Sequence, residues 1–116
     1  MAFTYDLTTD TGKVRLELGD TTGDAGIRPD GSNLQDEEIA VWLSRESDVM
    51  RAVAAACESL SRQWSAIADT QSGPLSESAG AVAGKWAERG KALRATYGYG
   101  AATGSAFVGG FIREDE

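Results

Sequence analysis

The side chains of this chain that could do chemistry are carboxylates, because it has no histidine and a single cysteine. Histidine is the commonest general base and zinc ligand, so its absence, with a single cysteine, excludes imidazole and zinc chemistry. Asp36, Glu37 and Glu38 are consecutive acids and could serve as paired carboxylates in acid–base catalysis. They are better explained as the acidic first turn of a helix, where the helix dipole favours negative charge. No motif of a catalytic nucleophile or a phosphate-binding loop is present, so we expect no enzyme, catalytic residue or cofactor.

A second group of acids lies in the glycine-rich segment 20–33, which we expect to be a surface loop with only Ile27 to bury. Its residues Asp20, Asp24 and Asp30 carry the oxygen ligands that calcium prefers. Their spacing does not match the twelve-residue calcium loop, and no glutamate closes it, so no metal site is expected. The single cysteine, Cys57, cannot form a disulfide framework, and we expect its thiol to be buried.

The segment 9–19 must position the first acids of this loop, and its pattern is ambiguous. Val14, Leu16 and Leu18 alternate with other residues as in a strand. A run of N-cap residues at its start and Gly19 at its end favour a short helix instead. We therefore predict a helix.

The next helix has a readable start. If Gln35 is the N-cap, Glu38 falls at the third helical position and can accept a hydrogen bond from the N–H of the cap. Leu34 and Ile39 bracket this turn as a hydrophobic staple. These signals predict a helix over 35–45.

Two longer helices are predicted over 48–69 and 77–97, because apolar residues recur there at spacings of three and four. Between them, 72–80 is expected to be a turn-rich connector that contains Pro74. Among the glycines of the last helix, only Gly90 falls on the apolar stripe, so close packing of a second backbone is expected there alone.

The expected fold is mostly α: a small bundle of about four helices, with the long acidic loop 20–33 and an extended C-terminal tail. Residues 1–97 are expected to form the single helical domain, since a chain of 116 residues suits one small core. The expected core comprises Ile39, Trp42, Leu43, Val49, Val53, Leu60, Trp64, Ile67, Val82, Trp86 and Leu93.

Residues 98–116 have five glycines and yet keep aromatic and branched side chains, which a plain disordered terminus normally lacks. We expect this segment to be a docking tail that becomes ordered on a partner, with strand addition as one mode. Its candidate contact residues are Tyr99, Phe107, Val108, Phe111 and Ile112.

The formal net charge of −7 argues against binding nucleic acid by phosphate neutralisation. Residues 1–69 carry 6 basic and 13 acidic groups, whereas 70–97 carry 4 basic and 2 acidic. The basic segment could meet the acidic face of a neighbouring copy, or both could be solvated faces. The candidate seam residues are Lys85, Arg89, Lys91 and Arg94. Without an apolar run long enough to span a bilayer or a signal-peptide pattern, we expect no membrane association and a protein that is cytosolic where it is made.

Three features follow one another along the chain: VRLELGDT at Val14–Thr21, the helix start LQDEEIAVWL at Leu34–Leu43, and the alanine-rich helix that follows Asp48. In this order they resemble the small head-tail connector proteins of tailed bacteriophages, also called head-completion or adaptor proteins. The likeness covers residues 9–97.

The resemblance implies a structural virion protein of the phage neck, made in the host bacterial cytoplasm. It implies a homo-oligomeric ring under the portal protein, typically of twelve copies, that extends the DNA channel and presents a surface to the next neck or tail-completion protein. An acidic lumen would let DNA pass without specific binding, since like charges repel.

Two other classes of function compete with this one. The first is a small acidic helical protein that binds and inhibits a host or phage DNA-binding protein, as a DNA mimic. The second, ranked last, is a small hydrolase that depends on a carboxylate.

Overall fold

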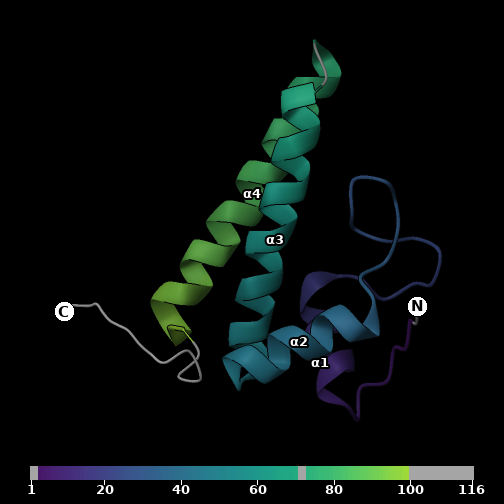
Figure 1. The fold of residues 1–116 in the computed structure, drawn as a ribbon, viewed down its shortest axis with the longest axis vertical. Helices are drawn as coiled ribbons and strands as arrows, with labels where there is room; N and C mark the ends of the chain where they lie inside the picture. Colours follow the sequence, from purple (N-terminus) through teal and green to yellow (C-terminus); the bar gives the residue numbers. More distant parts are fainter. Residues whose placement is uncertain (1–2, 71–72, 100–116) are drawn as a thin grey trace.

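The computed structural model describes residues 3–70 and 73–99 (Figure 1). In these residues the chain forms four α-helices and no named strand, as predicted. The helices are α1 (Asp10–Leu18), α2 (Asp36–Glu46), α3 (Val49–Thr70) and α4 (Pro74–Tyr97).

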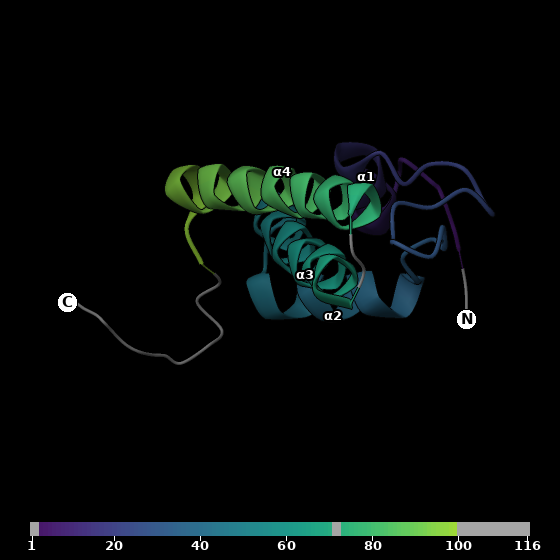
Figure 2. The ribbon, with the colours of Figure 1, turned by 90° about the horizontal axis from the view of Figure 1, so that it is seen from above.

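The long helices α3 and α4 run side by side as an antiparallel hairpin (Figure 1). Helix α2 crosses one end of α3, and the view from above shows α3 lying between α4 and α2 (Figure 2). Helix α1 contacts both α2 and α3. The central helix α3 therefore contacts each of the other three, and the loop between α1 and α2 extends from one side of this unit.

The structure decides between helix and strand for the first segment. Thr9 Oγ1 accepts a hydrogen bond from the N–H of Gly12 at 3.0 Å, which caps α1. Gly19 ends the helix with a φ of 82°, a left-handed conformation that favours glycine. Val14 and Leu18 are buried four residues apart, whereas Leu16 is 51% exposed. The alternation of apolar residues is thus one face of a helix plus one exposed leucine.

The start of α2 matches its prediction. The N–H of Gln35 donates to Glu38 Oε1 at 3.0 Å, as in a capping box. Leu34 and Ile39, the predicted staple, are both fully buried in the core. This fixes the direction in which the loop enters α2.

The prediction of a turn-rich connector through residue 80 is wrong, because α4 begins at Pro74. Proline suits the first position of a helix, since its φ is already helical and it lacks an N–H that would have no partner there. The turn is made at Gly73, which has a φ of 68°. Ser76 Oγ donates to the carbonyl oxygen of Ala68 at 2.8 Å and ties the start of α4 to α3.

The core is small and lies where α3 meets the other helices. The run 52–56, four alanines and Val53, forms much of the buried surface of α3. Gly90 lets α4 approach this surface, because a Cβ there would lie 3.4 Å from Cys57 Cβ and from Glu58 Cγ. Gly84 faces open space, so the prediction that only Gly90 packs closely is confirmed. The buried cluster consists of Val14, Leu18, Leu34, Ile39, Ala52, Val53, Ala56, Cys57 and Leu60.

Of the predicted core residues, Ile39, Val53 and Leu60 belong to this buried cluster. Five others are partly buried and pack against it: Trp42, Leu43, Val49, Trp86 and Leu93. Trp64, Ile67 and Val82 are half-buried and lie outside it. The indole Nε1 of Trp64 donates to the carbonyl oxygen of Ile27 at 3.2 Å, which attaches the loop to α3.

Candidate functional site

Two arginines are buried at opposite ends of α2, and each holds two carboxylates. The Arg15 cluster consists of Arg15, Asp20 and Asp36, near the start of α2. The Arg94 cluster consists of Arg94, Glu46 and Glu58, near its end. Burying an unpaired charge costs much free energy. Removing one charged partner from either cluster is therefore expected to destabilise the fold strongly.

The guanidinium of Arg15 is fully buried and binds three separate parts of the chain. Its Nη1 donates to Asp20 Oδ2 at 2.6 Å, and its Nη2 donates to Asp36 Oδ1 at 2.7 Å. Its Nε donates to the carbonyl oxygen of Thr4 at 2.8 Å. The ring of Phe3 lies 4.2 Å from the guanidinium carbon, a cation–π distance. Arg15 thus joins the N-terminal segment, the loop and α2.

Asp20 closes the loop 20–33 at its base. Its Oδ1 accepts a hydrogen bond from Asn33 Nδ2 at 2.8 Å, and its Oδ2 accepts one from the N–H of Leu34 at 3.0 Å. The expectation that only Ile27 is buried in this loop is therefore wrong, because Asp20 is fully buried.

The two other candidate calcium ligands, Asp24 and Asp30, are exposed. Asp30 accepts hydrogen bonds from the N–H and the hydroxyl of Ser32. Hydrogen bonding to Ser32 lowers the pKa of Asp30. The structure therefore does not bring Asp24 and Asp30 to the buried carboxylate of Asp20.

Asp36 has a lowered pKa, although burial alone would raise it. The hydrogen bonds from Arg15 and from the N–H of Thr4, together with the charge of Arg15, outweigh the burial. The carboxylate of Asp36 is thus held in its charged form, with its negative charge next to the start of α2. Glu38 pairs with Arg28 of the loop. The acidic run at 36–38 is used within the chain to fix the start of α2.

The Arg94 cluster joins three helices. Arg94 Nη1 and Nη2 donate to the two carboxylate oxygens of Glu46 at 2.8 and 3.1 Å. Its Nε and Nη2 donate to the two oxygens of Glu58 at 3.0 and 3.1 Å. Burial lowers the pKa of Arg94, but these hydrogen bonds more than offset it and raise the pKa above its ordinary value. The guanidinium stays charged at all relevant pH values.

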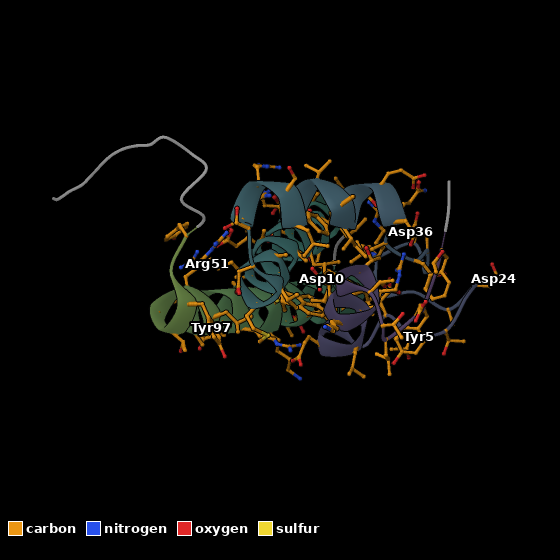
Figure 3. The ribbon with its side chains drawn as sticks, turned by 90° about the horizontal axis from the view of Figure 1, so that it is seen from below. Tyr5, Asp10, Asp24, Asp36, Arg51 and Tyr97 are labelled. Atoms are coloured by element: carbon orange, nitrogen blue, oxygen red, sulfur yellow. The ribbon has the colours of Figure 1, made fainter. Side chains whose placement is uncertain are left out.

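The chain leaves the helical unit at a fixed place beside this cluster. Arg51 Nε donates to the carbonyl oxygen of Tyr97 at 2.7 Å, and both residues lie at the end of the molecule opposite Asp36 (Figure 3). Arg94 Nη1 also donates to the carbonyl oxygen of Gly98 at 3.1 Å. The ring of Tyr99 lies 4.2 Å from the guanidinium carbon of Arg94. Residues 97–99 are therefore held by side chains of α3 and α4.

The four candidate seam residues do not form one free basic surface. Arg94 is 8% exposed and paired within the chain, and Arg89 pairs with Glu17 at 3.6 Å. Lys85 and Lys91 are exposed. Of the tail residues, Tyr99 is 69% exposed, while Phe107, Val108, Phe111 and Ile112 lie outside the described residues.

Cys57 is fully buried, as predicted. Burial raises the pKa of its thiol from 9.0 to about 11, and the neighbouring charges of Arg89 and Glu58 modify it in opposite directions. At neutral pH the thiol is therefore protonated and a poor nucleophile.

Comparison with protein-family models, with curated proteins and with solved structures finds no match to this chain. None of the four described helices is both long enough and apolar enough to cross a lipid bilayer. Within residues 3–70 and 73–99, no group of three or more Cys, Asp or Glu side chains is arranged to hold a metal ion.

Proposed function

We propose that this protein is a structural component of a bacteriophage neck that forms a ring under the portal. It extends the DNA channel and presents a surface to the next neck or tail-completion protein. The observation that carries the proposal is the Arg15 cluster. Arg15 and Asp20 lie in the segment Val14–Thr21, and Asp36 lies in the segment Leu34–Leu43, so one buried guanidinium joins two of the three features that carry the resemblance.

This cluster supports the proposal because one set of ion pairs explains the charged residues of both motifs. Arg15 and Asp20 pair at the base of the loop 20–33, and Asp36 links this pair to the start of α2. Chance likeness in two separate segments would not require their side chains to pair.

The small core is a second reason to propose assembly. Six of the thirteen buried apolar residues are alanines, each of which removes little apolar surface from water. A subunit with so modest a core gains stability from neighbours in a ring. In a ring each copy uses two different surfaces, so the same contact repeats until the ring closes.

The charge of the chain fits a channel through which DNA moves. The excess of acids over bases in residues 1–69 would repel the DNA backbone if these residues line the lumen. DNA would then pass without being held. A ring lined by lysine and arginine would contradict this part of the proposal.

The test is incorporation into heads. Full-length protein is added to DNA-filled, tailless heads that carry the portal protein of the same phage genome, and to matched heads without portal. We expect a ring of density under the portal by electron microscopy, and co-sedimentation only with portal-bearing heads. Protein that ignores both kinds of head and instead captures a DNA-binding protein as a monomer would replace the proposal with the inhibitor function.

A further inference from the structure

A groove of about 380 Å³ lies between α3 and α4, next to the place where the chain leaves the helical unit. Its walls include Glu58, Arg62, Ala87, Lys91, Arg94 and Tyr99. It therefore combines charged side chains from both helices with the apolar surface of Ala87 and the ring of Tyr99.

Of the three cations in this groove, one is paired and two form no ion pair within residues 3–70 and 73–99. Arg94 is neutralised by Glu46 and Glu58. Arg62 and Lys91 are exposed, and neither forms an ion pair among the described residues. Glu58 lies four residues before Arg62 on α3, but its carboxylate binds Arg94. The groove thus offers two free positive charges on a protein whose net charge is −7.

An acidic peptide segment complements this groove better than a nucleic acid does. Two cations neutralise too few phosphates to hold DNA at physiological salt against the repulsion of the acidic remainder. Arg62 on α3 and Lys91 on α4 suit two or three carboxylates of an extended segment, and Ala87 and the ring of Tyr99 suit an apolar residue of the same segment.

The sequence of this chain contains two runs of three consecutive acids. The run at 36–38 is committed within the subunit through Asp36 and Glu38. The other run is 114–116, and Arg113 separates it from the apolar pair Phe111-Ile112. Residues 111–116 lie outside the described residues, so their sequence alone enters the argument.

The geometry points to the groove between α3 and α4 as the receptor for residues 111–116 of a second copy of this chain. Tyr99 lines the groove of its own chain, where its ring lies 4.2 Å from the guanidinium carbon of Arg94, so the C-terminal segment starts at the rim of this groove. Fifteen residues separate Tyr99 from Glu114 and span at most about 50 Å when extended. The described unit is 42 Å in its longest dimension, so the acidic run can reach the next copy.

This inference rests on the proposed ring, because each copy both inserts its C-terminal segment and receives that of its neighbour. Such a contact uses two different surfaces per copy and is therefore compatible with closure into a ring. It names the partner surface that the ring would use, and it does not involve Lys85, which lies on α4 outside the groove.

Cross-linking distinguishes a neighbour's segment from the chain's own. Full-length protein carrying Lys91→Cys and Asp115→Cys is treated with a short bis-maleimide, while the buried Cys57 stays unreactive. We expect a ladder of covalent multiples on a denaturing gel. The matched control carries Lys85→Cys and Asp115→Cys and should give a several-fold weaker ladder. A cross-link confined to the monomer band, or no excess over the control, overturns the inference.

Charge reversal tests the same contact without new cysteines. In sedimentation at low salt, we expect Arg62→Glu with Lys91→Glu to weaken self-association about tenfold or more, because attraction across the groove becomes repulsion. Replacing Glu114, Asp115 and Glu116 with lysine should have the same effect. An equimolar mixture of the two variants should associate again, since each acidic groove then meets a basic segment. Circular dichroism checks that both variants keep their helices, and Lys85→Glu is the control.

The results also separate this inference from the proposed function. Wild-type association retained by the Arg62→Glu, Lys91→Glu variant would overturn the docking of residues 111–116, while incorporation into heads would still support the ring. Wild-type protein that fails to enter portal-bearing heads would count against the proposed function, whatever the cross-linking shows. Retardation of duplex DNA that is lost in the Arg62→Glu, Lys91→Glu variant would assign the groove to DNA and overturn the inference.

Discussion

Replacing Arg15 with alanine tests whether the Arg15 cluster holds the fold together. The change removes three hydrogen bonds of 2.6 to 2.8 Å and leaves Asp20 fully buried without its cation. Removing one partner of a buried ion pair costs about 3 to 5 kcal/mol. We expect the lower part of this range, because Asn33 and the N–H of Leu34 still donate to Asp20. A domain of this size has a total stability of about 5 to 15 kcal/mol, so a large share would be lost.

The assay is urea unfolding followed by circular dichroism at pH 7, together with thermal melting. A loss of about 3 kcal/mol corresponds to a fall in Tm of roughly 12 °C or more for about 100 residues. The control is Lys13→Ala on the same helix, whose pair with Asp10 is exposed and 3.8 Å long, and which should change stability by less than about 0.5 kcal/mol. Equal effects of the two substitutions would refute the reasoning, because burial would then make no difference to these two charges.

Three further predictions follow from packing and titration. Gly90→Leu should destabilise the fold by about 1 to 3 kcal/mol in urea unfolding, because a Cβ at this position would already contact side chains of α3. Gly84→Ala should stabilise it by about 0.5 to 1 kcal/mol, since that position is open; the same sign for both would contradict this helix packing. Cys57, whose pKa is raised to about 11, should react with iodoacetamide at pH 8 far more slowly in the native protein than in urea, and equal rates would show that the thiol is accessible. Because the pKa of Asp36 is lowered on folding, its contribution is full above about pH 5 and is lost as the pH falls through the lowered value, so the stability difference between wild type and Asp36→Asn should shrink towards pH 3. A difference that stays constant with pH would mean that the charge of Asp36 is irrelevant.

Local signals explain why the helices could be predicted from the sequence. The cap at Gln35, the glycine stop at Gly19 and the apolar spacing of α3 each act within a few residues of the chain, and the structure has helices at all of these places. The error at the start of α4 came from interpreting Pro74 as a breaker, although the same residue is well suited to the first turn of a helix.

Long-range pairing explains what could not be predicted. Glu58 lies four residues before Arg62 on α3, a spacing at which a helix can pair them, but the guanidinium of Arg94 on α4 binds both carboxylate oxygens of Glu58. The burial of Arg15 depends on carboxylates 5 and 21 residues further along the chain. The charged residues that alternate with the apolar ones in this segment do not indicate which of them is buried or which acids are its partners.

The closed base of the loop 20–33 has a consequence for how such proteins can diversify. Asp20 and Asn33 bring the two ends of the loop together by a direct hydrogen bond, whatever lies between them. Lengthening a loop with fixed ends costs only about 0.6 kcal/mol for each doubling of its length. The exposed tip around Asp30 and Gly31 is therefore a place where insertions can accumulate, so that new surface can be added beside α3 without altering the fold that carries it.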